Sequence, residues 1–205
     1  GAGIGGTVAA KFASEGYHSC LCRRSDQEGL DRLVTGIEDE GGSANGYLIN
    51  AIEDNVIEDL INTIESDVGP IEVVVYNLGA QTGMKLLKDT SHKEFEWGWR
   101  MASLGLFRVA KVLCPIMKER GKGTILVTSA TAAMRGNATQ HSHAAAMGAR
   151  RMLSQSLNAE FSASNIHVAH IVIDGAVDAP DTLGKMLGPE MFKKFRETKG
   201  MEHDL

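Results

Sequence analysis

Hydrophobic and polar positions along the chain follow two patterns that alternate, and together they predict an α/β protein. Short apolar runs predict strands at residues 17–22, 47–51, 71–76, 124–128 and 166–173. Between these runs, apolar residues recur every three or four positions, as on the buried face of a helix. Strands that alternate with helices favour a doubly wound parallel sheet with helices on both faces, a three-layer α/β/α arrangement. We expect a single domain over residues 1–205.

Polar residues at the segment boundaries predict where the helices begin. Ser25-Asp-Gln-Glu28 and Ser91-His-Lys-Glu94 both have the spacing of a capping box, in which the serine and the glutamate satisfy backbone N–H groups at a helix start. The second box should open a long helix that runs through Phe95 and Met117. The run at 71–76 is apolar enough to be buried on both faces of a sheet.

The chain opens on a glycine-rich segment, Gly1-Ala-Gly3-Ile4-Gly5-Gly6. Glycines there allow a tight turn, and they let backbone N–H groups at a helix N-terminus approach a pyrophosphate. The strand that should precede such a turn is central in a sheet ordered 3-2-1-4-5-6. We therefore expect the natural chain to extend before Gly1.

The segment Thr128-Ser-Ala-Thr131, followed by His143 to Met147 and then Gln155-Ser-Leu157, resembles the active-site strand and helix of the short-chain dehydrogenase/reductase family. That family carries a Ser at the strand end, a Tyr-x-x-x-Lys on the helix and an Asn on the preceding long helix. The resemblance places the Ser, Tyr, Lys and Asn positions at Ala130, His143, Met147 and Ala102. All four usual catalytic residues are thus predicted to be substituted.

The resemblance also implies a Rossmann-type fold and a dinucleotide cofactor. The family has a seventh strand, for which this sequence has no counterpart, so the resemblance implies that the natural chain extends beyond Leu205 as well. An acid closing the second strand would favour NAD; Cys22 stands there instead, and Arg23 and Arg24 follow. Arginine suits the 2′-phosphate of NADP, so NADP is the predicted cofactor, with NAD as the alternative. The competing interpretation is two solvated arginines at a helix start. The cofactor-binding residues implied by the resemblance are Gly1, Gly3, Ile4, Gly5, Arg23, Arg24, Asn50, Ala51, Asn77, Gly79, Gly175 and Val177.

Three residues remain as candidates for catalysis. An unperturbed imidazole titrates near neutrality without a lysine to tune it, so His143 could replace the Tyr, and Ser129 or Thr131 could supply the missing hydroxyl. The alternative is that His143 is a polar filler in an unused pocket. The predicted activity is a weak or atypical hydride transfer between NAD(P)(H) and a carbonyl or alcohol; the alternative is an inactive domain that serves as a binding or assembly subunit.

The overall composition limits the classes of partner that the chain is expected to bind. A net charge of −5 with scattered basic residues argues against nucleic acid, and no apolar run reaches membrane-spanning length. Three cysteines without metal spacing favour small buried residues in a reducing compartment, so we expect the cytoplasm or an organelle matrix and no secretion. His141 is interpreted as loop and His167 and His170 as strand residues, with no metal site. The family's pairing of two long helices implies a homodimer or homotetramer.

Overall fold

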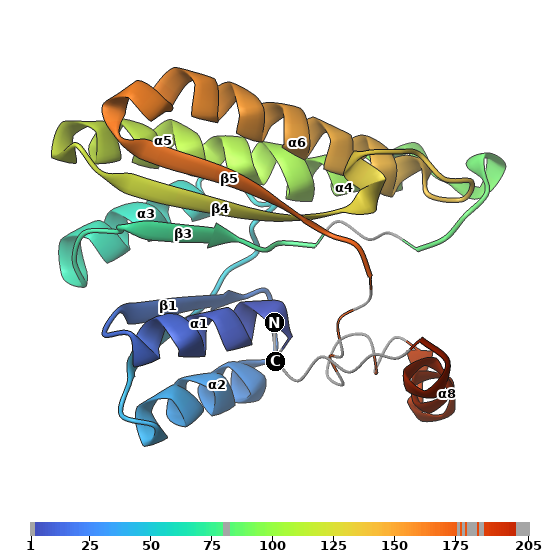
Figure 1. Ribbon diagram of the computed structural model, residues 1–205, viewed down its shortest axis with the longest axis horizontal. Helices are drawn as coiled ribbons and strands as arrows, with labels where there is room; N and C mark the ends of the chain where they lie inside the picture. The colour runs from blue at the N-terminus through green and yellow to red at the C-terminus, as the bar shows by residue number, and fades with distance from the viewer. Residues whose placement is uncertain are drawn as a thin grey trace. The chain divides into compact units, whose positions relative to one another are not determined.

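The structure is a computed structural model that describes residues 3–79, 83–175, 177, 179, 184 and 187–199. It divides into two compact units: Gly1–Asn50 with Gly175–Leu205, and Ala51–Asp174. In both, helices alternate with parallel strands, which confirms the predicted α/β class (Figure 1).

The first unit is built on a two-stranded parallel sheet. Its elements are α1 (Ile4–Ser14), β1 (His18–Arg23), α2 (Gln27–Asp39), β2 (Ser43–Leu48) and α8 (Pro189–Lys199). β1 and β2 pair in register from His18 opposite Ser43 to Arg23 opposite Leu48. The buried core of the sheet and its two helices consists of Ala13, Leu21, Leu30, Ile37 and Ala44. This core is built from the helical stripe and the strand that the hydrophobic pattern predicts.

The start of α2 differs from the predicted capping box. Asp26, not Ser25, is the N-cap: its backbone is left-handed, with a φ of 74°, and its Oδ1 accepts the Gly29 N–H at 2.9 Å. The other carboxylate oxygen lies 3.0 Å from Nη1 of Arg23. The aspartate therefore caps the helix and pairs with the arginine at once, which is why the cap lies one residue later than the box predicts.

The second strand of this unit begins and ends earlier than the apolar run predicts. β2 covers Ser43–Leu48, so Asn50 and Ala51 lie after it. The last inter-strand bond runs from the Ile49 N–H to the Arg23 carbonyl at 2.8 Å, because β1 ends there. A Cβ added at Gly46 would come within 2.7 Å of the Leu30 side chain, so close packing on α2 favours glycine at a position that strand propensity disfavours.

The second unit is a three-stranded parallel sheet with the order β3-β4-β5. Three helices pack on one face of it and share its largest core, namely α3, α5 and α6 (Figure 1). In chain order the elements are α3 (Val56–Asp67), β3 (Val73–Tyr76), η1 (Leu87–Asp89), α4 (His92–Trp99), η2 (Arg100–Leu104), α5 (Gly105–Arg120), β4 (Gly123–Ala130), η3 (Thr131–Ala133), α6 (His141–Phe161), η4 (Ser162–Ser164) and β5 (Ile166–Ile173).

The strand neighbours agree with the predicted order. In a sheet ordered 3-2-1-4-5-6, the second and third strands are neighbours, and so are the fourth, fifth and sixth. Those are the pairs β1-β2 and β3-β4-β5. The prediction that the run at 71–76 is buried on both faces is wrong for this sheet, since Val73, Val74 and Val75 are only half-buried.

Two helix predictions need correction and one is confirmed. The Ser91–Glu94 capping box is present, with both reciprocal hydrogen bonds. The long helix it opens is not uniform, because a π-helical turn at Arg100–Leu104 separates α4 from α5. His141 is the first residue of α6 and not part of a loop. Among the residues that the structure describes, no helix is long and apolar enough to cross a membrane.

Candidate active site

The carboxyl end of β4 faces the second turn of α6. Ser129, on β4, is 7% exposed and donates its hydroxyl to the Sδ atom of Met147, on α6, at 3.7 Å. Met147 itself is only 2% exposed. The serine hydroxyl, predicted as a candidate for catalysis, is therefore turned toward a buried thioether.

Three of the four positions that the resemblance assigns to the family's catalytic residues lie in one apolar cluster. Ala102, Ala130 and Met147 pack together with other small or apolar side chains, namely Met101, Ala132, Ala133, Ala146 and Ala144. His143, the fourth position, lies one turn before Met147 on α6 and is half-buried. The fold thus brings three of the assigned positions into one apolar cluster, and the side chains at those three positions carry neither a hydroxyl nor a charge.

Thr131 has a structural role in the same region. It is the first residue of the short helix η3, and its backbone carbonyl accepts the N–H groups of Met134 at 2.9 Å and Arg135 at 3.2 Å. The threonine is half-buried, and its position directly after Ala130 is set by the end of β4. His143 is therefore the one titratable side chain among the three residues predicted as catalytic candidates.

A buried arginine, which the sequence reasoning missed, lies three residues after Met147. Arg150 is 2% exposed and donates to three backbone carbonyls: Nε to Ala102 at 3.0 Å, Nη1 to Thr128 at 2.9 Å and Nη2 to Leu78 at 2.6 Å. Burial lowers the pKa of its guanidinium to about 10, so the side chain remains a cation at neutral pH. Arg150 ties the π-helical turn, β4 and the segment after β3 to α6.

Tyr76 completes this buried network. Its hydroxyl donates to the Met101 carbonyl, and its ring lies under the Arg150 guanidinium, 5.1 Å from centroid to Cζ. Burial raises the pKa of the Tyr76 phenol to about 12, so the hydroxyl serves as a hydrogen-bond donor and not as a proton source. The next residue, Asn77, was predicted as a cofactor residue, and its Oδ1 accepts the Thr128 hydroxyl at 2.7 Å.

In the first unit, the glycine segment leads directly into α1. Gly3 is the N-cap, and its carbonyl accepts the N–H groups of Gly6 at 3.1 Å and Thr7 at 3.2 Å. Ile4 and Gly5 form the first turn, where helix N–H groups point outward. This is the local geometry that binds phosphate. Gly1 lies outside the described residues.

The two arginines at the end of β1 differ in their surroundings. Arg23 has a side chain that is 14% exposed and lies 3.0 Å from the Asp26 carboxylate. A Cβ added at Gly29 would come within 2.0 Å of Nη1 of Arg23, so this guanidinium lies over the first turn of α2. Arg24 is exposed and has no salt bridge among the described residues. Arg24 is thus the more available of the two cations.

The remaining predicted cofactor residues are divided between the units. Asn50, Gly175 and Val177 belong to the first unit, and Gly175 has a φ of +154°, which favours glycine. Ala51, Asn77 and Gly79 belong to the second unit; Ala51 packs against its core and Gly79 is exposed.

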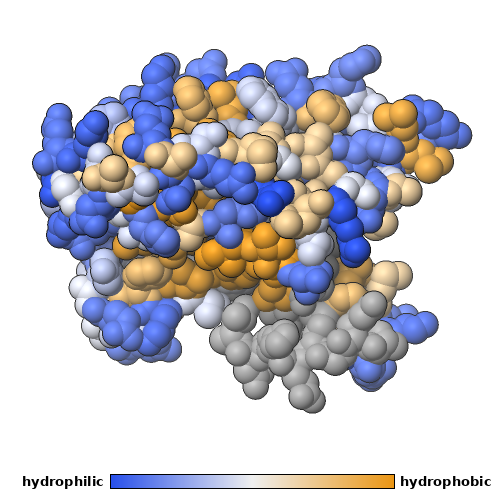
Figure 2. Space-filling view, turned by 45° about the horizontal axis from the view of Figure 1, so that its top comes forward, coloured by the Kyte–Doolittle hydropathy of each residue, from blue (hydrophilic) through white to orange (hydrophobic). Residues whose placement is uncertain are grey.

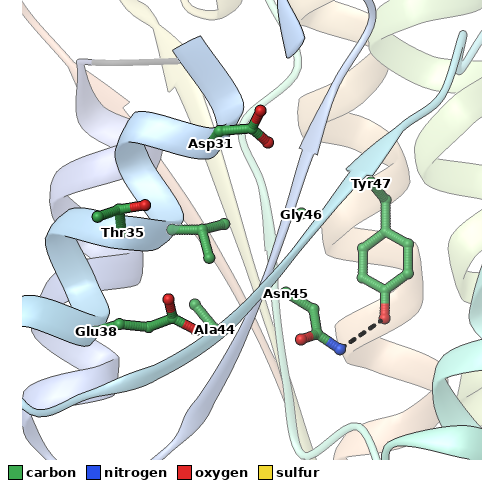
Figure 3. A pocket seen from close by; sticks show the side chains of 8 residues that line it. Asp31, Thr35, Glu38, Ala44, Asn45, Gly46 and Tyr47 are labelled. Carbon is green, nitrogen blue, oxygen red and sulfur yellow. Dashed lines mark hydrogen bonds between the residues drawn. The ribbon is translucent and has the colours of Figure 1, made fainter. Parts of the chain in front are cut away.

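The first unit also contains a hollow that none of these predictions concerned. It has a volume of about 450 Å³ and lies between α2 and β2 (Figure 3). Its walls carry the carboxylates of Asp31 and Glu38, and the Asn45 amide donates to the Tyr47 hydroxyl at 3.4 Å beside it. None of the residues that line it was predicted as a site residue.

Comparison with known proteins agrees with this architecture. A 2,3-dihydro-2,3-dihydroxybenzoate dehydrogenase from Bacillus subtilis strain 168 is 26% identical over 86% of this chain and 66% of its own length. The crystal structure of a short-chain dehydrogenase from Rhodopseudomonas palustris is 27% identical, with a TM-score of 0.78 over 98% of this chain and 87% of that one. A gluconate 5-dehydrogenase from Burkholderia cenocepacia J2315, in complex with NADP and tartrate, shares the fold at 23% identity and a TM-score of 0.77, over 87% of this chain and 69% of that one.

The fold defines a Rossmann-type α/β protein, as predicted. The family described as short chain dehydrogenase matches residues 1–184, and the chain belongs to that family. The chain spans about two thirds of the length of the first curated relatives that it matches.

Proposed function

We propose that this chain binds NAD(P)(H), with a preference for NADP(H), and belongs to an oxidoreductase that transfers hydride between the cofactor and a carbonyl or alcohol. The observation that carries the proposal is the N-terminus of α1, where Gly3 opens a helix whose first N–H groups are free of side-chain caps. The cofactor, when bound, supplies the hydride; the protein positions it.

Arg24 supports the preference for NADP(H). Because Arg23 is paired with Asp26, the exposed Arg24 is the cation better placed to meet a 2′-phosphate. The solved relative bound to NADP is consistent with this choice. A xylitol dehydrogenase with the same fold is described as bound to NAD+, so NAD remains the alternative cofactor.

Calorimetric titration with NADPH and NADH tests the preference. We expect NADPH to bind more tightly than NADH. Arg24→Ala should weaken NADPH binding by about tenfold, which is about the effect of losing one charged contact, and should have little effect on NADH binding. Arg32→Ala is the matched control, because Arg32 is an exposed arginine on the same unit that pairs only loosely with Glu28, at 4.0 Å. Tighter binding of NADH would overturn the preference.

The apolar cluster around Met147 supports weak or atypical turnover. General acid–base catalysis contributes about 10²- to 10⁴-fold, and the cluster of Ala102, Ala130 and Met147 offers no group for it. His143 is then the acid that protonates the developing alkoxide in a reduction. The alternative function is an inactive domain that binds the cofactor and serves as an assembly subunit; the buried Ser129 hydroxyl favours it.

Turnover on a panel of carbonyl substrates separates these two functions. If His143 is the acid, His143→Ala lowers turnover by about 10²-fold or more while cofactor affinity stays nearly unchanged. His141→Ala, two residues earlier on α6, is the control. Turnover that is untouched by His143→Ala, or cofactor binding without any turnover, would leave the inactive domain as the function.

We also propose that the chain assembles as a homodimer or homotetramer and works in the cytoplasm or an organelle matrix. The assembly proposal is supported by large hydrophobic side chains that are exposed along α4, α5 and α6, namely Phe95, Trp99, Phe107 and Met152. Figure 2, which turns the α6 side toward the viewer, shows hydrophobic residues interspersed with hydrophilic ones on that surface.

A further inference from the structure

Two arginines in the second unit hold one short loop by its backbone. The loop is Ile52–Asp54, between Ala51 and the start of α3. Arg100, in the π-helical turn, donates Nη2 to the Ile52 carbonyl at 3.0 Å. Arg108, two helical turns later on α5, donates Nη1 to the Glu53 carbonyl at 2.8 Å. Consecutive carbonyls of the loop are therefore fixed by separate guanidinium groups.

The same two arginines also meet the carboxylate of Asp54. Arg108 Nη2 bonds to Asp54 Oδ1, and Arg100 Nη2 lies 3.4 Å from that oxygen. Arg108 additionally pairs with Glu58 on α3, with Nε 3.7 Å from Oε1, and its side chain is only 13% exposed. A guanidinium presents several donors in a fixed plane, so a network of this kind restrains a backbone far more than an isolated surface ion pair does.

We call Arg100 and Arg108, with their contacts to Ile52–Asp54, the arginine clamp. The clamped loop directly follows, along the chain, residues that the resemblance implies for cofactor binding. Asn50 and Ala51 immediately precede the loop, and the resemblance implies both as cofactor-binding residues. The family usually carries an Asp near Asn50 that contacts adenine, and the resemblance implies the same end of the cofactor here. The clamp also starts from the π-helical turn that carries Ala102. We propose that Arg100 and Arg108 are positioning residues for the adenine end of NADP(H): they hold Ile52–Asp54 so that Ala51 is ordered before the cofactor arrives. This inference rests on the proposed function.

The expected effect is on affinity, because a loop that is ordered in advance does not have to be ordered on binding. Replacing Arg108 by glutamine removes the donor to Glu53 and the charge that meets Asp54 and Glu58. We expect NADPH to bind about tenfold more weakly, which corresponds to about 1.4 kcal/mol. Adenosine 2′,5′-bisphosphate, the adenine half of NADP, should lose affinity by a similar factor, whereas reduced nicotinamide mononucleotide, which lacks adenine, should not.

Calorimetry with these three probes on wild type, Arg108→Gln and Arg100→Gln tests the inference. The matched control is Arg120→Gln, because Arg120 also pairs with a glutamate, Glu65, and donates to a backbone carbonyl, that of Ile71, but holds a different segment of the same unit. Arg120→Gln should bind all three probes like wild type. Urea denaturation of each variant establishes that it is folded at the temperature of the titration.

The possible outcomes of the titrations distinguish failure of this inference from failure of the proposed function. If wild type binds NADPH and Arg108→Gln binds it equally well, the clamp does not position the cofactor and the inference is wrong, while the proposed function stands. The inference is also wrong if Arg120→Gln or the adenine-free probe shows the same loss, because the effect then reflects general destabilisation. If wild type binds neither NADPH nor NADH, the proposed function itself fails, and this inference fails with it.

Discussion

At the scale of single residues, Arg150 is the charge whose surroundings matter most for the second unit. It is almost fully buried, and the bonds that satisfy it go to the carbonyls of Ala102, Thr128 and Leu78. A buried guanidinium is tolerated only where its donors are satisfied and its charge is compensated by dipoles. Here the three carbonyl dipoles and the face of the Tyr76 ring do so. The side chain thereby joins the segments that carry the candidate site.

Arg150→Lys should lower the free energy of unfolding by about 2–4 kcal/mol. A lysine keeps the buried charge, but one ammonium cannot reach three carbonyls that a planar guanidinium spans, and each carbonyl left unsatisfied costs about 1–3 kcal/mol. Arg151→Lys, the neighbouring half-buried arginine, should change stability by less than about 0.5 kcal/mol. Urea denaturation measures both variants, and equal stability of Arg150→Lys and wild type would contradict the role given to Arg150.

His170, on β5, gives the protein a predicted sensitivity to acid. Burial is the largest cause that lowers the pKa of its imidazole, and the charges of Arg151 and Arg150 lower it further. The unfolded chain then binds the proton at higher pH than the folded chain does. Stability is therefore fully present above the unfolded pKa of about 6.5 and is lost as the pH falls below it toward the lower pKa of the folded state.

The unfolding free energy at pH 7.5 and at pH 5 measures this effect. His170→Gln should show a smaller difference between the two pH values than wild type does, because the proton uptake of the unfolded state at this position is gone. His167→Gln, an exposed histidine on the same strand, should behave like wild type. A difference that is unchanged in His170→Gln would assign the acid sensitivity to other groups.

Sequence could assign positions for a candidate site but not their surroundings. The helical register places His143 and Met147 on one face of α6, and in the structure Met147 shares an apolar cluster with Ala130 and Ala102. The roles of these residues stay predictions. Arg150 was missed because an arginine on a helix ordinarily faces water. The signal was present in the spacing, since the buried positions of α6 include 146, 147, 150, 154 and 157, and residue 150 lies on that stripe.

At the scale of secondary-structure elements, the π-helical turn is the feature that shapes the site. It places Met101 and Ala102 where Tyr76 and Arg150 reach their carbonyls, and π-helical turns are frequent at functional sites. Gly105 directly follows the turn and packs on the tyrosine: an added Cβ would lie 2.1 Å from the Tyr76 hydroxyl. The absence of a side chain there lets α5 approach β3.

Gly105→Ala should destabilise the protein by about 1–3 kcal/mol, although alanine is the better helix former. The Tyr76 hydroxyl cannot move away easily, because the tyrosine ring lies beneath Arg150 and the hydroxyl donates a hydrogen bond to the Met101 carbonyl. Gly36→Ala is the matched control: Gly36 is exposed in α2 with nothing within 4 Å of an added Cβ, so the variant should gain about 0.5–1 kcal/mol. Thermal unfolding of the two variants should therefore shift in opposite directions.

Element boundaries were the weaker part of the sequence prediction. The strand at 166–173 and the helix start at Ser91 were predicted correctly, because a long apolar run and a capping box are strong local signals. The start of α2 and the bounds of β2 were not, since they depend on the contact of Asp26 with Arg23 and on pairing with β1. Interactions between segments set these boundaries, and local propensity carries no information about such interactions.

At the scale of the whole molecule, the alternation of strands and helices predicted a doubly wound parallel sheet, and the family resemblance predicted the Rossmann-type fold; the strand neighbours in both sheets agree with these predictions. The predicted order of strands follows from general rules for parallel sheets, so it did not require any particular side chain. Assembly is different, because it depends on which exposed side chains meet a second copy. That part of the prediction rests on the family resemblance and on the exposed residues of α4, α5 and α6.

The assembly proposal makes a prediction for the chain in solution. Trp99 and Phe107 are 44% and 47% exposed, and burying such side chains against a second copy would stabilise a symmetric dimer. Light scattering at micromolar concentration should give the mass of a dimer or tetramer. Phe107→Glu should shift the mass toward the monomer, because a dimer would then bury an unpaired carboxylate twice. Val68→Glu, at an exposed valine just after α3, should leave the mass unchanged. A wild-type chain that is monomeric under these conditions would refute the assembly proposal, and equal masses for wild type and Phe107→Glu would place the contact on another surface.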